Sequence, residues 1–434
     1  MQHETQEAAS RTLNVLYISS RINAPDGSSV HGRAFHRNVA KLGHEIRTFP
    51  AIEPIRYIQD KSAGDQRSRL EKLRQAGLSS VIKSRVRKLG RFASDLVDLY
   101  DGLADTVRYF LGVREILKDF SPDVMVCRAT VFNFAPQLIR RIYRLPCVSE
   151  VNSIKYLEIS VASRNGAAAR LTRWAEQFAI NHSDRVFVVS QPIKDFVDGF
   201  YPPEHCSVIP NGVETDDFDP ARFDKNALKE QLGIKDRIVL GYVGSYKAWH
   251  GIPTSVELIQ QLYRKNPRYM LLLIGNGEQY GEIKSSIASK GLQDMVKQID
   301  YVPHEDVPRY TAVFDYAVMT YPDFEGFYFS PLKMYEYMSM GTPVVSTNTG
   351  QIGTIIRSGE TGELVYPPTV DNFAEAIESL QNSADKYQAV STAARTEVLR
   401  HHSWLGNASQ VISVCEELLE KAGGSAGHVE DLKT

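Results

Sequence analysis

The 434-residue chain has few of the features that would assign it to a specialised class of protein. Cysteine occurs only four times, as Cys127, Cys147, Cys206 and Cys415, without the spacing of a metal site or a redox pair. Such sparse usage predicts a reduced compartment rather than a secreted, disulfide-bonded protein. No apolar run is long enough to cross a bilayer, and no secretory signal is recognisable. We therefore expect a cytoplasmic protein, soluble or peripheral to the inner face of the membrane.

The chain also lacks an excess of charge of either sign. Its formal net charge is -2 and its pI is near 6.6, which argues against a dedicated nucleic-acid binder. Positive charge is concentrated in one segment, RSRLEKLRQAGLSSVIKSRVRKLGR, from Arg67 to Arg91. A basic amphipathic helix of this kind can contact an anionic membrane surface. The alternative, slightly favoured, is a solvated helical face.

Motifs for metal or dinucleotide binding are missing as well. Asp216, Asp217 and Asp219 lie in a polar stretch without supporting ligand spacing, so an acidic turn is the better interpretation and no metal is expected. Neither half of the chain carries a complete GxGxxG fingerprint with an acidic residue at the usual distance, which counts against a dehydrogenase.

What the chain does contain is a repeated alternation of apolar strand-like runs and helix-length segments. Such alternation predicts mainly parallel sheets, and a polar stretch at 210–223 separates two series of it. The fold class is therefore α/β, with two doubly wound Rossmann-like domains facing each other across a cleft. The expected strands are 13–20, 45–49, 123–127, 146–151 and 185–190, then 238–243, 269–274, 298–301, 316–320 and 343–346. The expected parts are a first domain at 1–212, a second at 213–403, a helix at about 404–421 packing back on the first, and a flexible tail at 422–434.

The segment YPDFEGFYFSPLKMYEYMSMGTPVVS predicts a helix that begins as an anion site. Ser330 is a good N-cap and Pro331 a good first residue, so a helix is expected from Pro331 to about Met340. Its free N–H groups and positive dipole end, with Lys333 one turn in, favour a phosphate. Glu336 shares the face of Lys333 and could accept hydrogen bonds from sugar or ribose hydroxyls. The alternative is a Lys–Glu surface pair.

Glycine-rich loops follow strands in both halves. Gly27 and Ser28 belong to a loop whose backbone could approach a ligand, with His31 close by. In the second half, GYVGSYKAWHG contains Gly244, and LLLIGNGE contains Gly275, although a plain turn explains that second GxG equally well.

Four motifs then occur in order: VIPNGVE at 208–214, GYVGSYKAWHG at 241–251, LLLIGNGE at 271–278 and SPLKMYEYMSMGTPVV at 330–345. Together they resemble the family-four retaining glycosyltransferases of GT-B architecture, over nearly the whole chain. The resemblance implies a nucleotide-diphosphate sugar bound mainly by the second domain and an acceptor held by the first. It also implies transfer with retention at the anomeric carbon and no cofactor or divalent metal. A UDP-sugar is the favoured donor.

The resemblance carries roles to particular residues of the second domain. Glu336 matches the glutamate that holds the ribose, and Val302 lies where the base is usually contacted. Ser330, Pro331 and Leu332 match the backbone segment that receives the diphosphate.

Some positions depart from the family pattern. Where the family usually places an arginine and a lysine beside the diphosphate, this chain has Ser245 and His250. We therefore expect Lys247 and Lys333 to share that positive charge.

A second group of departures concerns the sugar and the acceptor. The first of the family's two glutamates is replaced by Tyr328, and the only nearby acid is Glu325. In the first domain, Arg128 stands where many members have histidine and Asn152 where others have a His–Asp pair. Arg128 joins the two lysines as a candidate catalytic residue, without a proton-transfer step. Asn152 and His31 are expected on the acceptor side.

These features predict a hexosyltransferase acting on a carbohydrate or lipid-linked acceptor in exopolysaccharide or cell-envelope glycan synthesis. One alternative is a nucleotide-sugar 2-epimerase of the same architecture, against which the small supply of carboxylates speaks. Another is a catalytically silent sugar-nucleotide-binding assembly partner.

Overall fold

The computed structural model describes residues 11–24, 27–54, 91–159, 166–323 and 326–423. The chain divides into two compact units, each built around one sheet. The first comprises Met1–Val188, Ile193–Val208 and Ala408–Thr434, and the second comprises Val189–Pro192 and Ile209–Asn407. The predicted contact of 67–91 with a membrane concerns residues that lie almost wholly outside the described ranges.

The first unit contains a six-stranded parallel sheet in the order β2-β1-β3-β4-β5-β6. Every residue of β4 is buried, as expected for a central strand covered on both faces. The sixth strand was not predicted. The strands are β1 (Asn14–Ile18), β2 (Glu45–Phe49), β3 (Val124–Arg128), β4 (Cys147–Val151), β5 (Arg185–Val188) and β6 (Cys206–Val208).

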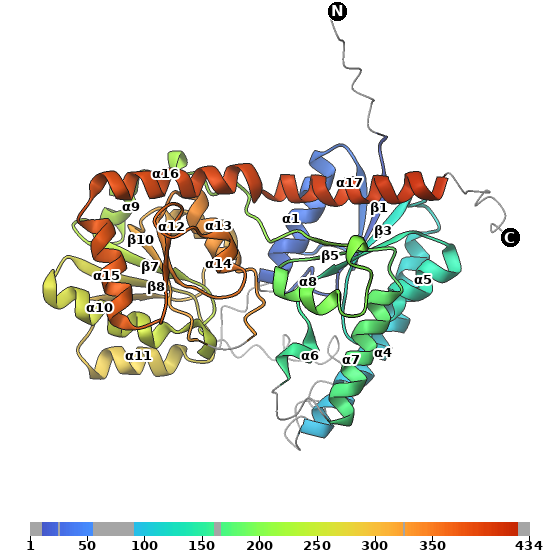
Figure 1. Cartoon of the computed structure of the whole chain (residues 1–434), viewed down its shortest axis with the longest axis horizontal. Helices are drawn as coiled ribbons and strands as arrows, with labels where there is room; N and C mark the ends of the chain where they lie inside the picture. Colours follow the sequence, from blue (N-terminus) through green and yellow to red (C-terminus); the bar gives the residue numbers. More distant parts are fainter. Residues whose placement is uncertain (1–10, 25–26, 55–90, 160–165, 324–325, 424–434) are drawn as a thin grey trace, which may run out of the picture. The chain divides into compact units, whose positions relative to one another are not determined.

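Helices connect these strands and cover the sheet (Figure 1). One core cluster packs α4 and α5 onto β1 and β3, with Leu16, Tyr109, Met125 and Ile139 among its buried members. The helices are α1 (Gly27–Lys41), α4 (Arg91–Ile116), α5 (Ala135–Tyr143), α6 (Lys155–Glu158), α7 (Ala167–Asn181), α8 (Gln191–Val197) and α17 (Trp404–Gly423). Helix α17 belongs to the first unit from Ala408 onward.

The second unit repeats this architecture with the strand order β12-β11-β10-β7-β8-β9, again parallel throughout. Successive residues of β7 enter different core clusters, Val239 on one face and Leu240 on the other, so the sheet is buried on both sides. The strands are β7 (Ile238–Val243), β8 (Tyr269–Ile274), β9 (Val296–Ile299), β10 (Tyr316–Met319), β11 (Val344–Thr347) and β12 (Glu363–Val365). Strand β12 was not predicted.

Two layers of helices enclose the second sheet (Figure 1). They are α9 (Lys225–Gln231), α10 (Ile252–Lys265), α11 (Tyr280–Ser289), α12 (Val307–Thr311), α13 (Leu332–Ser339), α14 (Ile352–Ile355), α15 (Val370–Gln381) and α16 (Ala384–His401). The prediction of two doubly wound, Rossmann-like α/β domains is thus confirmed.

The polar stretch at 210–223 packs against the second unit along its length instead of forming a free linker. Phe218 is only 1% exposed and belongs to a core cluster of the second unit, while Val213 forms a β-bridge with Ser403. This stretch, expected as a connection between domains, is therefore an integral part of the second unit.

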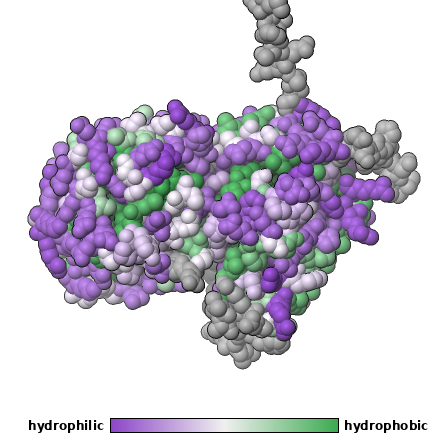
Figure 2. Space-filling model, in the orientation of Figure 1, coloured by the Kyte–Doolittle hydropathy of each residue, from purple (hydrophilic) through white to green (hydrophobic). Residues whose placement is uncertain are grey.

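The described helices include none that is long and apolar enough to cross a membrane. Hydrophilic residues cover most of the face of each unit drawn in Figure 2, with hydrophobic areas between them.

Candidate functional site

The first turn of α13 lies at the carboxyl edge of the second sheet, because α13 joins the parallel strands β10 and β11. The predicted helix is confirmed, but the prediction that Ser330 is its N-cap is wrong. Pro331 occupies that position, without a side-chain cap. The Ser330 hydroxyl instead accepts a hydrogen bond from the Asn211 N–H at 3.1 Å and lies 3.0 Å from the Tyr335 hydroxyl. Asn211, which the sequence reasoning missed as a site residue, also donates its amide to the Ser330 carbonyl at 2.6 Å.

Lys333 heads a chain of polar contacts that gathers four predicted residues. Its ammonium donates to the Tyr242 hydroxyl at 2.9 Å and lies 4.1 Å from the centre of that ring. The Tyr242 hydroxyl donates in turn to the Ser245 carbonyl at 2.9 Å, and His250 Nδ1 lies 2.5 Å from the same carbonyl. A Cβ atom at Gly244 would stand 2.6 Å from the ammonium, so glycine leaves the space that Lys333 occupies. Tyr242, which joins these groups, was not predicted.

The electrostatics of these contacts around Lys333 favour a negatively charged ligand. Desolvation lowers the pKa of Lys333 to about 7, and the charge of Glu336 opposes this shift only in part. Burial, with the charge of Lys333, lowers the pKa of His250 to about 3, so this imidazole is neutral near pH 7. Among the described residues, no carboxylate lies within ion-pair distance of Lys333. An anion bound here would raise the pKa of Lys333 and favour its charged form.

Glu336 is held by a histidine. Its carboxylate oxygen Oε1 lies 2.8 Å from His304 Nε2, and the residue is only 6% exposed. Because Lys333 and Glu336 take different partners, the alternative of a Lys–Glu surface pair does not describe this helix. Val302, two residues before His304, is half-buried against the core cluster that contains Tyr335 and Tyr337 of α13. His304 was missed, since a histidine outside a motif gives no signal in the sequence.

The two glycine loops of the second unit touch each other. Gly275 has a φ of 127°, and a Cβ atom there would stand 2.1 Å from the Gly244 carbonyl oxygen. The GxG after β8 is therefore needed for this close approach and is more than a plain turn. Lys247, by contrast, forms an ion pair of 3.0 Å with Glu278, whose side chain is 72% exposed.

Tyr328 lies inside an aromatic group. It is 3% exposed, and its ring centre is 4.3 Å from that of Phe329, which stacks on Trp249. The Tyr328 carbonyl accepts a hydrogen bond from Ser190 at 2.5 Å. The other candidate for the sugar, Glu325, lies outside the described residues.

In the first unit, the carboxylate of Glu150 gathers three predicted residues. It is fully buried in β4 and lies 3.1 Å from His31 Nε2 and 3.8 Å from Arg128 Nη1. The Asn152 amide donates to the same carboxylate, and the Tyr17 hydroxyl donates to its other oxygen at 3.1 Å. We call these five residues the Glu150 cluster. Glu150 and Tyr17 were not predicted, although a lone glutamate in the apolar run CVSEV marked a buried charge.

The surroundings of Glu150 keep it ionised. Burial alone would raise the pKa of this carboxyl, but His31, Arg128 and the hydrogen bonds outweigh burial and hold the pKa below its ordinary value. The same burial, with the charge of Glu150, raises the pKa of Tyr17 well above its ordinary value, so Tyr17 stays a hydrogen-bond donor. The cluster is thus a charge-balanced unit at the carboxyl ends of β1, β3 and β4.

The prediction that Gly27 and Ser28 lie in a loop is wrong. Both residues belong to the first turn of α1. The Ser28 carbonyl accepts a hydrogen bond from Arg128 at 3.0 Å, and its hydroxyl accepts one from Arg21 at 3.1 Å. These contacts hold the turn in helical geometry and join it to the Glu150 cluster.

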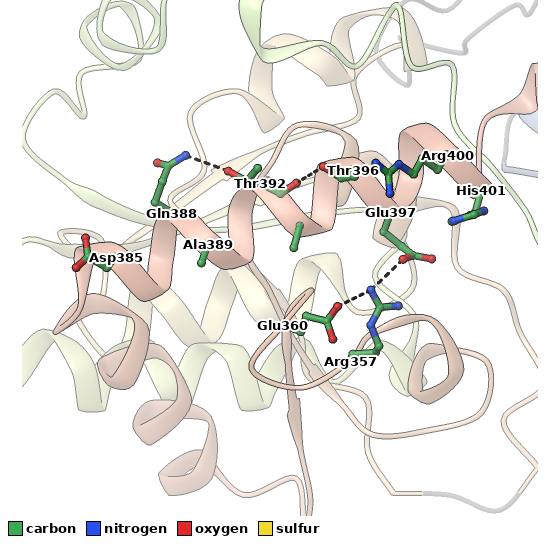
Figure 3. A pocket seen from close by; sticks show the side chains of 11 residues that line it. Arg357, Glu360, Asp385, Gln388, Ala389, Thr392, Thr396, Glu397, Arg400 and His401 are labelled. Carbon is green, nitrogen blue, oxygen red and sulfur yellow. Dashed lines mark hydrogen bonds and ion pairs between the residues drawn. The ribbon is translucent and has the colours of Figure 1, made fainter.

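A surface groove of the second unit lies elsewhere, along α16 and the loop between α14 and β12 (Figure 3). Three of its charged groups are paired: Arg357 binds Glu360 at 2.9 Å and Glu397 at 3.0 Å. Within the described ranges, no three histidine, cysteine, aspartate or glutamate side chains come together as a metal site.

Comparison with known proteins connects both units to one class of enzyme. A family model for glycosyl transferases group 1 matches residues 224–397, and a model for glycosyltransferase family 4 matches residues 25–217. The alpha-D-kanosaminyltransferase of Streptomyces kanamyceticus is 24% identical over 254 residues, which cover 57% of this chain and 64% of that enzyme. The alpha-maltose-1-phosphate synthase of Mycolicibacterium smegmatis is 26% identical over 296 residues, which cover 64% of this chain and 75% of that enzyme.

Solved structures show the same fold. HepE from Anabaena, solved in complex with UDP, aligns with a TM-score of 0.63 at 16% identity and covers 94% of this chain and 100% of its own. The sucrose-phosphate synthase of Thermosynechococcus elongatus aligns with a TM-score of 0.68 at 18% identity and covers 95% and 100%. The family 4 model covers most of the first unit, and the group 1 model lies within the second. Both solved structures align with the two units together. The chain belongs to the family-four-like glycosyltransferases of GT-B architecture.

Proposed function

We propose that this glycosyltransferase moves a hexosyl group from a nucleotide-diphosphate sugar to an acceptor with retention at the anomeric carbon. The observation that carries the proposal is the start of α13, where a helix N-terminus, the Lys333 ammonium and the His304-held Glu336 carboxylate come together. These are the groups that a nucleoside diphosphate requires: N–H donors and a cation for phosphate, and an acceptor for the ribose hydroxyls.

The chemistry follows from where charge develops. As the bond between the anomeric carbon and the diphosphate breaks, negative charge grows on the leaving phosphate oxygens. The N–H groups of Leu332 and Lys333 and the Lys333 ammonium stabilise that charge without a divalent metal. Lys247 adds a further positive charge once its ion pair with Glu278 is broken. Because that pair is exposed, breaking it costs little free energy. Ser245, His250 and the Gly244 and Gly275 loops shape the same end of the second sheet.

A UDP-sugar is the favoured donor, because the HepE neighbour was solved with UDP and with UDP-glucose. We assign the acceptor to the first unit, where Arg128, Asn152 and His31 present polar groups held by Glu150. The acceptor class is a carbohydrate or a lipid-linked glycan of exopolysaccharide or cell-envelope synthesis.

A catalytically silent nucleotide-sugar-binding partner is the second candidate. It is favoured by Lys247, which is already paired with Glu278, and by Tyr328, which lies among aromatic rings instead of offering a carboxylate. A 2-epimerase is less well supported, since it needs acid and base groups around the sugar ring.

A binding and turnover experiment separates these readings. In a thermal-shift screen of UDP, GDP and ADP, a nucleotide that binds only the folded protein raises the melting temperature by mass action. We expect UDP to give the largest shift and purified protein to release UDP from a UDP-sugar when acceptor is present. Binding without turnover on any donor would favour the silent partner, and no response to any nucleotide would reject the proposed donor site.

The matched variants test the residues. Glu336→Gln should weaken UDP binding about ten-fold, as expected for the loss of a charged hydrogen-bond acceptor. Glu378→Gln is the control, because Glu378 lies on α15 in an ion pair with Lys265. Equal UDP affinity in the two variants would remove Glu336 from the donor site.

A further inference from the structure

Trp249 is a large aromatic side chain that stays exposed beside the proposed donor site. It belongs to η4 (Ala248–His250), between β7 and α10, and is 41% exposed. Of the other two tryptophans, Trp404 is buried and Trp174 lies on α7 of the first unit. A single exposed aromatic residue is normal on a protein surface, so exposure alone assigns no role to Trp249. The residues around it do more.

Trp249 continues an aromatic group that adjoins the N-terminus of α13. Its ring plane lies within 8° of that of Phe329, with the ring centres 6.3 Å apart, and Phe329 packs edge-on against Phe327 at 5.5 Å. Phe327 packs in turn on Tyr321, whose ring centre is 5.8 Å from that of His250. Phe329 is half-buried and lies three residues before α13 begins. We call Trp249 and Phe329 the aromatic platform.

The position expected to hold the sugar through a carboxylate adds another ring instead. Tyr328 is 3% exposed, and its ring centre lies 4.3 Å from that of Phe329. It therefore supports the aromatic platform from behind and offers a sugar no negative charge. What this part of the site presents to a ligand is an aromatic surface.

The proposed contacts of a nucleotide sugar follow one direction along the carboxyl edge of the second sheet. Val302 comes after β9, and His304 beside it holds Glu336, so the base and the ribose lie toward β9. Lys333 instead donates to a hydroxyl of β7, so the diphosphate lies nearer β7. Strand β8 lies between β9 and β7, and β10 lies on the other side of β7. The sugar, joined to the outer phosphate, then meets the loops that follow β7 and β10, which carry the aromatic platform.

Lys247 links the aromatic platform to the diphosphate. Its ammonium lies 5.3 Å from the centre of the Trp249 ring and 3.0 Å from the Glu278 carboxylate. In the proposed reaction this ammonium moves to the diphosphate and thereby leaves the ring. Binding of the donor phosphates and uncovering of the Trp249 ring are thus coupled through one side chain.

We propose that the aromatic platform is the sugar subsite of the donor site and stacks on the C–H face of a pyranose ring. The C–H groups of a pyranose carry small positive charges, which favour the negative face of an aromatic ring over water. The donor sugar is then recognised by the shape of its apolar face and not by a carboxylate that binds its hydroxyls. This assignment rests on the proposed function, because it takes the start of α13 as the phosphate site.

UDP and UDP-glucose, titrated separately into the full-length protein, distinguish the sugar contact from the nucleotide contacts. In titration calorimetry, Trp249→Ala should weaken UDP-glucose binding about ten-fold, as expected for the loss of a stacked aromatic contact, and should change UDP binding by less than about two-fold. Trp249→Tyr keeps an aromatic ring and should retain most of the affinity for UDP-glucose.

Trp174→Ala is the matched control, because it removes the other exposed tryptophan, which is 53% exposed. It should leave the affinities for both ligands as in the parent. Tryptophan fluorescence gives a second readout. UDP-glucose should change the emission of the parent and of Trp174→Phe, and should change that of Trp249→Phe much less.

Three results would overturn the assignment, and they differ in what they leave standing. If the parent binds no UDP, the proposed donor site is rejected and the sugar subsite with it. If UDP binds but Trp249→Ala keeps the parent affinity for UDP-glucose, the donor site stands and the aromatic platform does not contact the sugar. If Trp249→Ala weakens UDP and UDP-glucose equally, the ring contacts the nucleotide and not the sugar.

Discussion

In the first unit, the carboxylate of Glu150 is surrounded by partners, whereas in the second unit the ammonium of Lys333 has a phenol beside it and no paired carboxylate among the described residues. The pKa values move accordingly. That of Glu150 falls despite burial, so its charged form is stabilised. That of Lys333 falls because of burial, so its charged form is disfavoured.

The difference indicates the role of each group. The charge of Glu150 is already balanced by its partners and does not need a ligand, so Glu150 instead fixes the orientation of His31, Arg128 and Asn152. An uncompensated ammonium at a helix N-terminus gains most when an anion arrives. We therefore interpret the Glu150 cluster as preorganised scaffold for the acceptor side and Lys333 as an incomplete site that a diphosphate completes.

Removing the compensated charge should have the largest effect. In Glu150→Ala the His31 and Arg128 side chains lose their common partner inside the first unit, which for a buried ion pair costs about 3–5 kcal/mol. The free energy of unfolding, from urea denaturation followed by circular dichroism, should fall by that amount.

An exposed pair in the same unit provides the control. Glu115→Ala breaks the surface pair with Lys118 and should cost less than about 1 kcal/mol. Because the pKa of folded Glu150 is lowered, its stabilisation is present above the unfolded pKa and is lost as pH falls through the folded pKa. Equal stability of the parent and Glu150→Ala at pH 7 would contradict the interpretation of a compensated cluster.

Replacing Lys333, whose charge is uncompensated, should not lower the stability of the protein but should strongly weaken nucleotide binding. Lys333→Met keeps the length of the side chain and removes a charge that burial disfavours, so stability at pH 6 should be equal to or above that of the parent. Nucleotide affinity, measured by titration calorimetry, should fall about 100-fold, as expected for the loss of a charge-assisted contact. Lys265→Met, which removes a surface pair with Glu378, is the control for both quantities.

The pH dependence has a definite sign. The pKa of Lys333 is about 7 in the folded protein and near 10.4 when unfolded, so the unfolded state binds more protons between these values and stability rises with pH there. A bound diphosphate raises the folded pKa, so nucleotide affinity should decrease from pH 7 to pH 9 with proton uptake. A pH-independent affinity, or the same pH dependence in Lys333→Met, would show that Lys333 does not meet the phosphates.

Most of the fold could be predicted because its signal is local. Ten of the twelve strands in the described part of the chain were predicted, most of them from apolar runs, since buried parallel strands are continuous in hydrophobic residues. The two strands that were missed, β6 and β12, have three residues each and lie at sheet edges. Such short edge strands contain too few apolar residues to stand out in the sequence. The anchoring of 210–223 was missed because Phe218 enters the core from a stretch that is otherwise polar.

The site could be predicted where a motif fixes the local backbone, and only there. Both ends of α13 were predicted within one residue, because Pro331 favours a helix start and Gly341 and Pro343 favour a helix end at neighbouring residues. Contacts between distant elements leave no such pattern. Tyr242 meets Lys333 across 91 positions, and Tyr17 meets Glu150 across 133. Cys127 and Cys147, read as scattered, have sulfur atoms only 3.6 Å apart on adjacent strands.

The smallest effect is expected at His304, which acts on the proposed donor site through another side chain. Its Nε2 lies 2.8 Å from the Glu336 carboxylate, so His304 orients the group proposed to hold the ribose. His304→Ala should weaken UDP binding by about five-fold, the worth of one hydrogen bond, because Glu336 becomes free to rotate. His304→Gln, which keeps an N–H donor, should recover most of the affinity.

A ligand without ribose hydroxyls separates positioning from general damage. With 2′,3′-dideoxyuridine diphosphate, parent and His304→Ala should bind alike, because Glu336 then has no hydroxyl to hold. In a double-mutant cycle, His304→Ala should add nothing in the Glu336→Gln background, since the two residues act as one unit. If His304→Ala instead weakened both ligands equally, His304 would contribute through the stability of η5 (His304–Asp306) and its packing on Phe218, whose ring centre lies 5.8 Å away.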